Sequence, residues 1–225
     1  MAKRSPAIAF VGTAVALVAL VLTYRRLLRQ TVMTWGARPD EALRDLPGDE
    51  LLESADIIST RAITIGARPA AVWPWLVQMG SGRGGAYTYD WIENLLGLDM
   101  QSADRILPEF QKLEVGDVVP NKKGGPGMRV EMLEAERVLS WHSEDGNWVW
   151  TFVLVEEEGA TRLISRNRIK MGGALGGRLA MLVMEPGSLL MERKMLLGIK
   201  QRAEKLVRAE EGAGAPNGRQ PVTAG

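Results

Sequence analysis

Residues 148–155 have the sequence WVWTFVLV, and this stretch decides the fold. Aromatic and β-branched side chains favour a strand, where successive residues point to opposite faces. The alternation places large side chains on one face and valines on the other: Trp150, Phe152 and Leu154 against Val149, Val153 and Val155. Because a strand that is apolar on both faces is covered on both, we expect layers packed above and below this sheet.

Further short strands lie on both sides of this stretch, joined by the turn sequences 121-NKKGGPG-127, 143-SEDGN-147 and 156-EEEGA-160. The alternating pattern predicts strands at Leu113–Val119, Met128–Ala135, Val138–His142, Trp148–Val155 and Thr161–Ile169. An earlier β-branched run predicts one more strand at Ile57–Ile65.

Two short helices are expected between the first strand and the others. Pro69 suits the first turn of a helix over residues 69–79, and Pro74 should bend that helix. Asp90 and Glu93 have the spacing of a capping box for a second helix, which Gly97 would end.

An amphipathic helix is predicted from about Ser188 to Arg208. Its apolar face carries Leu189, Met195, Ile199, Ala203 and Leu206, and the pattern places Glu192 and the basic residues mostly elsewhere. The preceding residues 171–187 are too interrupted by glycine, Glu185 and Pro186 for a membrane span. The long helix is the natural cover for one curled antiparallel sheet, with a cavity between the two.

Four stretches together resemble the START/polyketide-cyclase (SRPBCC) superfamily: 61-RAITIGARPAAVWPWLVQMG-80, 84-GGAYTYDWIENLLGLD-99, 115-VGDVVP-120 and 185-EPGSLLMERKMLLGIKQRAE-204. The resemblance covers roughly residues 57–209 and is to a membrane-anchored bacterial branch of undefined activity. It implies an α+β helix-grip fold, in which a curved antiparallel sheet wraps around a long C-terminal helix. The superfamily includes lipid carriers, hormone receptors, aromatase/cyclases and quinone-binding proteins, so the resemblance does not identify a ligand.

The N-terminal run 7-AIAFVGTAVALVALVLTY-24 is uncharged and has basic residues at both ends. At 1.5 Å per residue it is roughly 27 Å long as a helix, close to the thickness of a bilayer core, and it predicts a single transmembrane anchor. More basic residues follow the run than precede it, which favours a cytoplasmic body. We expect an anchor over residues 1–29, a juxtamembrane connector over 30–55, a ligand-binding domain over 56–209 and a disordered tail over 210–225.

Composition excludes several classes of chemistry. The 225 residues contain no cysteine and one histidine, His142, which excludes thiolate nucleophiles, cysteine-bound metal clusters and two-histidine metal motifs. A net charge of +1 gives no reason to expect nucleic-acid binding. Gly80, Gly82 and Gly85 spell G-x-G-x-x-G, but the motif follows a helix and lacks a βαβ unit, so it does not predict a dinucleotide site. We expect no metal and no cofactor.

The candidate site is therefore an apolar cavity with a few orienting polar groups. Its predicted wall is Trp141, Trp150, Phe152, Leu154, Ser165, Asn167, Met191 and Met195. Methionines at 171, 181, 184, 191 and 195 suit an adaptable lid. Gly82, Gly84, Gly85, Tyr89 and Asp90 are candidates for a mobile gate, although the glycine segment is equally interpreted as a plain connection. The basic face formed by Arg162, Arg166, Arg168 and Lys170 is expected in solvent.

Three functions remain open. The leading hypothesis is a non-catalytic, membrane-anchored module that binds or carries a hydrophobic small molecule or lipid. The second is a cyclase- or dehydratase-like enzyme acting on a polyketide or isoprenoid through His142, Asp90 or an arginine. The third is a membrane-tethered interaction domain. The expected partners are the apolar ligand and the membrane contacted by residues 7–24, without nucleic acid.

Overall fold

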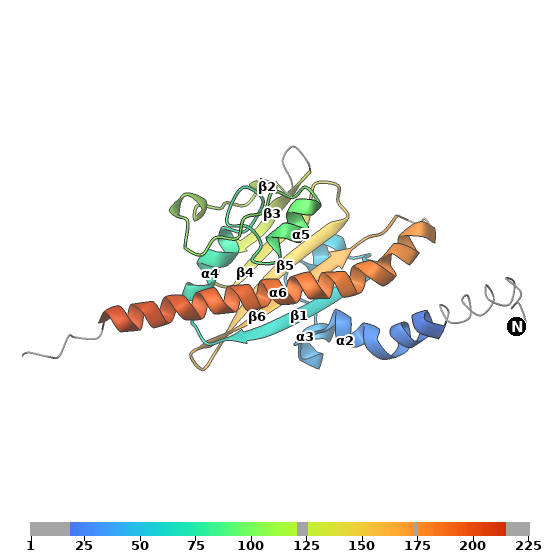
Figure 1. Cartoon of the computed structure of the whole chain (residues 1–225), viewed down its shortest axis with the longest axis horizontal. Helices are drawn as coiled ribbons and strands as arrows, with labels where there is room; N and C mark the ends of the chain where they lie inside the picture. The colour runs from blue at the N-terminus through green and yellow to red at the C-terminus, as the bar shows by residue number, and fades with distance from the viewer. Residues whose placement is uncertain (1–18, 121–125, 173–174, 215–225) are drawn as a thin grey trace, which may run out of the picture.

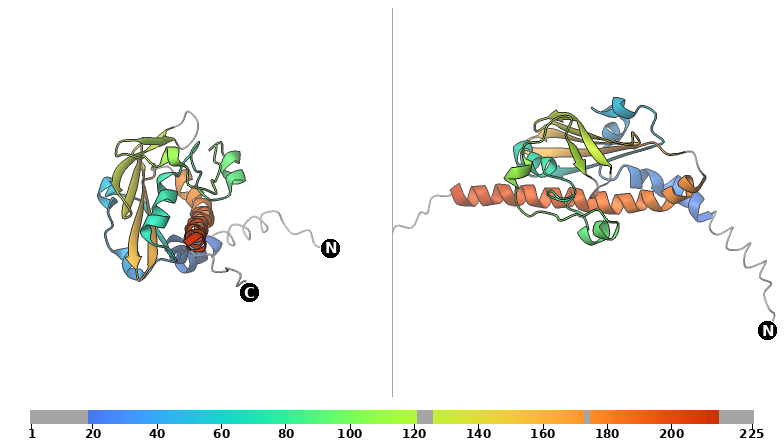
Figure 2. Two further views of the ribbon diagram at one scale, coloured as in Figure 1. Left: turned by 90° about the vertical axis from the view of Figure 1, so that its left-hand side faces the viewer. Right: turned by 90° about the horizontal axis from the view of Figure 1, so that it is seen from above.

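The computed structural model describes residues 19–120, 126–172 and 175–214. In this part of the chain, six strands form one antiparallel sheet in the order β1-β6-β5-β4-β3-β2 (Figure 1). Their bounds are β1 Ile57–Ile65, β2 Val118–Pro120, β3 Gly127–Glu134, β4 Val138–Ser143, β5 Trp148–Glu157 and β6 Ala160–Ile169. Figure 2 shows the sheet curving around one side of the long helix α6 (Leu175–Gly214). This arrangement is a helix-grip fold, which confirms the fold that the resemblance implied.

Five of the six predicted strands are confirmed to within two residues of their ends. The prediction for Leu113–Val119 was wrong over most of its length, because only Val118–Pro120 pairs with β3. The residues before it form a turn, in which the Asp117 N–H donates to the Glu114 carbonyl over 3.2 Å and Gly116 has a φ of 96°. A positive φ suits glycine and interrupts an extended strand.

The helix α6 begins 13 residues before the predicted start at Ser188 and continues through Pro186. Contacts from the N-terminal region compensate for the poor helix-forming sequence there. The Tyr24 hydroxyl and the Arg29 guanidinium both reach the Glu185 carboxylate, at 2.9 and 2.7 Å. Further along, Met195, Leu196, Ile199 and Ala203 are at most 1% exposed and pack against the concave face of the sheet. Tertiary contacts thus support the helix around Glu185, before the start that the sequence predicted.

Two helices lie between β1 and β2: α4 (Pro69–Val77), which contains Pro74, and α5 (Asp90–Leu95). A short 3₁₀ turn, Pro108–Phe110, follows them. The connector contains α2 (Arg29–Met33), α3 (Pro39–Leu43) and a 3₁₀ turn at Asp49–Leu52, after a π-helical turn at Tyr24–Leu28. These bounds confirm both predicted helices between the first strand and the rest of the sheet.

The connector from α3 onward covers the convex face of the sheet, and the expectation that the arginines of β6 are in solvent was wrong. Arg162 and Arg166 are only 6% and 3% exposed. Arg162 binds the Glu41 carboxylate at 2.7 Å, and Arg166 forms an ion pair with Asp49. Leu46 packs with Val153 and Ile164 on the same face. Charged strand residues can be buried here because a distant segment supplies their partners.

Residues 7–18 of the predicted span lie outside the described residues, as does the predicted tail from residue 215 onward. Residues 210–214 of that tail belong to α6, so the predicted disorder there was wrong. Among the described residues, no helix combines the length and the apolar composition that crossing a bilayer requires.

Candidate functional site

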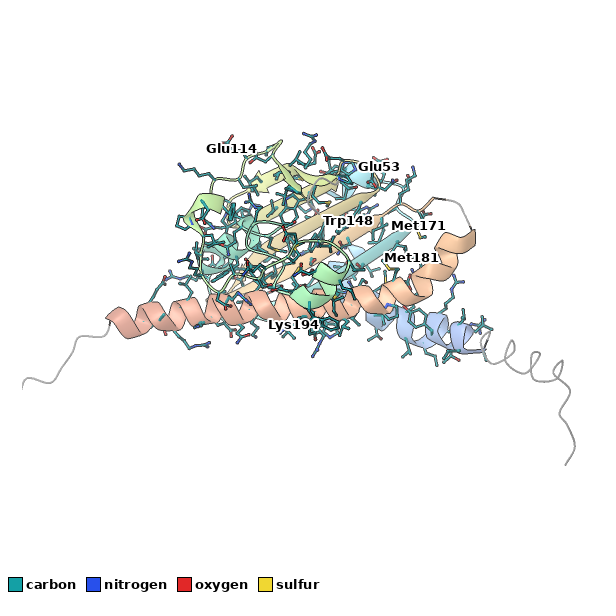
Figure 3. The ribbon with its side chains drawn as sticks, turned by 45° about the horizontal axis from the view of Figure 1, so that its top comes forward. Glu53, Glu114, Trp148, Met171, Met181 and Lys194 are labelled. Carbon is teal, nitrogen blue, oxygen red and sulfur yellow. The ribbon has the colours of Figure 1, made fainter. Side chains whose placement is uncertain are left out.

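A cavity of about 470 Å³ lies between the concave face of the sheet and the N-terminal half of α6. This volume is within the range of small-molecule sites, roughly 300–1,000 Å³. Its lining comes from β1, β5, β6, α2, α6 and the segment 86–100 that contains α5. Figure 3 labels Trp148 on the sheet and Met181 on α6, the two surfaces that enclose it. Two other depressions near the β5–β6 turn are lined in part by glutamates and do not lie under the helix.

The sheet contributes an aromatic wall. The rings of Trp148 and Trp150 are stacked with centroids 5.5 Å apart and an interplanar angle of 18°. Trp148 Nε1 donates to Asn167 Oδ1 over 2.8 Å, and Trp150 Nε1 donates to Ser165 Oγ over 2.9 Å. Because both indole N–H groups are satisfied within the sheet, the rings offer the cavity an apolar surface.

Methionines form much of the opposite wall. Met181, Met184, Met191 and Met195 line the cavity from α6, and Met33 lines it from α2. Unbranched thioether side chains adapt to ligands of different shapes at low cost. The C-terminal half of the helix differs, because Leu196, Ile199 and Ala203 are fully buried there in the hydrophobic core.

One set of polar side chains in the cavity wall forms a closed hydrogen-bond network centred on Arg61 and Glu192. Arg61 on β1 is fully buried and forms an ion pair with Glu192 on α6, which is 8% exposed. The guanidinium also donates to Ser188 Oγ over 2.9 Å, and Asn167 Nδ2 donates to the Glu192 carboxylate over 3.2 Å. Burial raises the pKa of the Glu192 carboxyl, and the Arg61 charge opposes that rise. The network joins sheet to helix and satisfies its own members.

A second polar group, Glu93 and Thr88, is not satisfied. Glu93 is 7% exposed, and its Oε2 has no hydrogen-bond partner in the described part of the chain; the same holds for Thr88 Oγ1. Both residues line the cavity. Burial is the main cause that raises the pKa of the Glu93 carboxyl, and the Asp90 charge raises it further. The Thr88 hydroxyl lies near enough to oppose that rise, although no hydrogen bond of normal geometry joins the two.

The capping box predicted from Asp90 and Glu93 was wrong. The residue before α5 is Tyr89, and no side chain caps the helix there. Asp90 instead accepts hydrogen bonds from the Ser102 N–H at 2.9 Å and the Ser102 hydroxyl at 2.6 Å. This side chain fixes the segment after α5 to its start, and Glu93 is left facing the cavity.

The predicted wall residues divide into two groups. Trp150, Asn167, Met191 and Met195 line the cavity. Trp141, Phe152 and Leu154 are at most 5% exposed and belong to the neighbouring core, and Ser165 lies behind Trp150 as the acceptor of its N–H. A role of either group in ligand binding stays a prediction.

The predicted gate residues lie in and after the glycine loop. Gly80 and Gly85 exchange two backbone hydrogen bonds of 3.0 and 3.1 Å, and the Gly84 N–H donates to the Gln78 carbonyl over 2.7 Å. A Cβ at Gly85 would lie 2.7 Å from the backbone of Gln101, whereas Gly82 faces open space. Tyr89 lies beneath the Lys194 ammonium, 5.7 Å from the ring centroid. Gating stays a prediction.

His142 is not brought to the cavity. It lies on β4 opposite Arg129 and Val149, and its Nε2 has no hydrogen-bond partner among the described residues. Of the other residue types named for an enzyme, Asp90 accepts a hydrogen bond from Ser102, and the arginine that lines the cavity, Arg61, is paired with Glu192.

Sequence reasoning missed several lining residues: Arg61, Thr88, Trp148, Ser188 and Glu192. Two of them had a signal in the sequence. Alternation along β1 puts Arg61 on the same face as Ile57 and Ser59, and helical spacing puts Glu192 on the same face as Ser188 and Met195. Both residues are charged, and charged residues are usually exposed. Because the partner of each is 131 positions away, the neighbouring sequence does not indicate that either is buried.

No family model matches the chain, and no curated protein matches it. Among solved structures the chain is similar to the KanY protein, with 13% identity and a TM-score of 0.45 over 67% of this chain and 99% of that one. It is also similar to the polyketide-cyclase-like protein Cgl2372 from Corynebacterium glutamicum, with 14% identity and a TM-score of 0.37 over 71% and 96%. A third is protein BH1534 from Bacillus halodurans, with 19% identity and a TM-score of 0.42 over 67% and 99%. At these values the likeness carries no argument about ligand or activity.

Proposed function

We propose that this protein binds a hydrophobic small molecule or lipid in the cavity under α6 and carries it beside a membrane without changing it chemically. The observation that carries the proposal is the cavity itself, about 470 Å³ between a tryptophan wall and a methionine wall. Removing apolar surface from water contributes about 25 cal/mol per Å², so such walls favour an apolar ligand body. The Arg61–Glu192 network is closed on itself and offers no free group to reacting atoms.

The membrane part of the proposal rests on two features. The first is the uncharged run of residues 7–24, which is long enough to span a bilayer and is followed by Arg25, Arg26 and Arg29. That basic flank favours a body on the cytoplasmic side. An anchor would keep the cavity close to lipid and so raise the local concentration of a lipid ligand.

The second feature is the outer surface of α5. Trp91, Leu95 and Leu96 are 69%, 80% and 69% exposed, while Glu93 from the same helix lines the cavity. Figure 2 shows α5 on the far side of α6 from the sheet, where it stands out from the body. Exposed tryptophan and leucine at such a tip suit the interface of a bilayer. We infer that α5 rests on the lipid surface and that ligand exchange occurs beside it.

The experiment is extraction of the full-length chain from its host membrane in a mild detergent, followed by native mass spectrometry and identification of any bound molecule. Met184→Trp should fill the cavity from its rim, because Met184 lines it and is 59% exposed. Leu190→Trp is the matched control, since Leu190 is 52% exposed on the same helix and does not line the cavity.

We expect one class of apolar molecule with the wild-type chain and the Leu190→Trp variant, and its loss from Met184→Trp. Absence of any bound apolar molecule from all three would favour the interaction domain. Recovery of a molecule that the protein converts on incubation would favour the enzyme.

A further inference from the structure

The cavity contains one unsatisfied polar position, formed by Glu93 and Thr88. Of the buried side-chain polar atoms that lack a partner in the described residues, Glu93 Oε2 and Thr88 Oγ1 are the two that belong to residues lining the cavity. Leaving a buried polar group unsatisfied costs about 1–3 kcal/mol, and more when the group is charged. Unsatisfied buried polar atoms in a native fold call for an explanation. A ligand group that pairs with both atoms would remove this cost.

The two atoms differ in what they require. A carboxylate oxygen only accepts hydrogen bonds, whereas a threonine hydroxyl can donate one as well as accept. A ligand carbonyl or ether oxygen could accept from Thr88 but would leave Glu93 unpaired. A ligand carboxylate would meet the like charges of Glu93 and Asp90, which opposes binding. A hydroxyl group donates and accepts at one oxygen, so it can satisfy both atoms.

We propose that the ligand of this cavity is a hydrophobic alcohol, whose hydroxyl donates to Glu93 Oε2 and accepts from Thr88 Oγ1. This inference rests on the proposed function. The apolar body of the alcohol lies between the tryptophan wall and the methionines of α6, and its hydroxyl lies at the α5 side of the cavity. That side is next to the exposed residues Trp91, Leu95 and Leu96, so the polar end of the ligand is placed near the expected lipid surface.

Hydrogen bonds within the protein fix the position of Thr88 and Glu93 independently of any ligand. Ser102 binds Asp90 through two hydrogen bonds, and the Tyr87 hydroxyl donates to the Trp75 carbonyl over 2.8 Å. The Tyr87 N–H also donates to Ser102 Oγ over 2.9 Å. Thr88 and Glu93 therefore lie on a segment that is held at both ends, which gives an alcohol a preorganised partner.

The test compares two isomers of identical composition, n-octanol and heptyl methyl ether, by isothermal titration calorimetry. The full-length chain is reconstituted in phosphatidylcholine nanodiscs, and the heat of partition into empty nanodiscs is subtracted. Both probes have an oxygen that can accept from Thr88, but only the alcohol can donate to Glu93. We expect the wild-type chain to bind n-octanol about tenfold more tightly, a difference of about 1.4 kcal/mol.

Three variants assign the preference to its atoms. Glu93→Leu should abolish the preference by weakening n-octanol alone, and Glu93→Gln should keep part of it, because the amide oxygen still accepts. Thr88→Val should weaken both probes, because both lose the same donor. Thermal unfolding of each variant checks that it is folded. If Glu93→Leu does not fold, the isomer ratio of the wild type and of Thr88→Val still decides.

Equal binding of the two isomers to the wild-type chain would overturn the alcohol inference and leave the carrier function standing. A preference that persists in Glu93→Leu would also overturn it. Binding of neither isomer to the wild-type chain would count against the carrier function itself.

Discussion

Arg61 and Glu192 form an ion pair that is almost completely withdrawn from water and joins the first strand to the last helix. Each side chain has further partners, which are Ser188 and the Val32 carbonyl for Arg61 and Asn167 for Glu192. A buried pair of this kind contributes little over an apolar replacement, but removing one partner leaves the other charge stranded. The pair thus fixes how α6 lies on the sheet above the cavity.

Arg61→Met should therefore lower the free energy of unfolding by about 3–5 kcal/mol, because Glu192 loses its counter-charge in a buried position. Denaturant unfolding followed by circular dichroism measures the loss. The double variant Arg61→Met with Glu192→Leu should recover most of it, since both charges are then absent. A double variant no more stable than Arg61→Met alone would show that packing around Arg61, and not its charge, determines the effect.

Gly198 on α6 allows the helix to approach the segment before α5. A Cβ at this position would lie 2.7 Å from the Tyr87 carbonyl oxygen and 2.9 Å from the Tyr87 Cβ. Gly198→Ala should gain about 1 kcal/mol of helix propensity but lose about 1–3 kcal/mol through forced backbone movement. We expect a net destabilisation, measured by thermal unfolding.

Gly187→Ala is the matched control for that change, since nothing lies within 4 Å of the Cβ that it would add to the same helix. It should leave the midpoint of unfolding unchanged or raise it. If Gly198→Ala stabilises the chain as much as Gly187→Ala does, the close approach of α6 to Tyr87 is not present in solution.

Glu93 should make the stability of the ligand-free protein depend on pH. Its folded-state pKa is raised above the ordinary value of 4.5, so the folded chain binds this proton more tightly than the unfolded chain does. The stability that this proton contributes is fully present below the ordinary pKa of Glu93, and it is lost as the pH rises through the folded-state pKa. Glu93→Gln removes that loss, because the amide stays neutral.

The Glu93→Gln variant should accordingly be more stable than the wild type at about pH 7, and the difference should shrink as the pH falls to about 4.5. Unfolding curves of both proteins across this range measure it. Glu109→Gln, at an exposed position, is the control and should follow the wild type throughout. A gap between Glu93→Gln and the wild type that stays constant with pH would contradict the raised pKa.

The sequence alone determined five of the six strands and the class of fold. Alternation over residues 148–155 and its neighbours is a local signal, because a strand that is buried on one or both faces must carry apolar side chains at fixed spacing. The turns with glycine at 146 and 159 were equally local, since both residues adopt the positive φ that glycine tolerates. Trp150 and Asn167 could be placed on the concave face for the same reason, and the register pairs them across β5 and β6.

Only the tertiary structure decided which charged residues are inside. Arg61, Arg162 and Arg166 are of a residue type that is usually exposed to solvent. Each is buried here because a carboxylate from a distant segment forms an ion pair with it: Glu192, Glu41 and Asp49, respectively. The sequence also did not place Glu93. Its spacing from Asp90 suggested a helix cap, but in the structure Asp90 accepts hydrogen bonds from Ser102 and Glu93 lines the cavity. A buried charge depends on partners that are remote in sequence, and no local pattern of side chains records them.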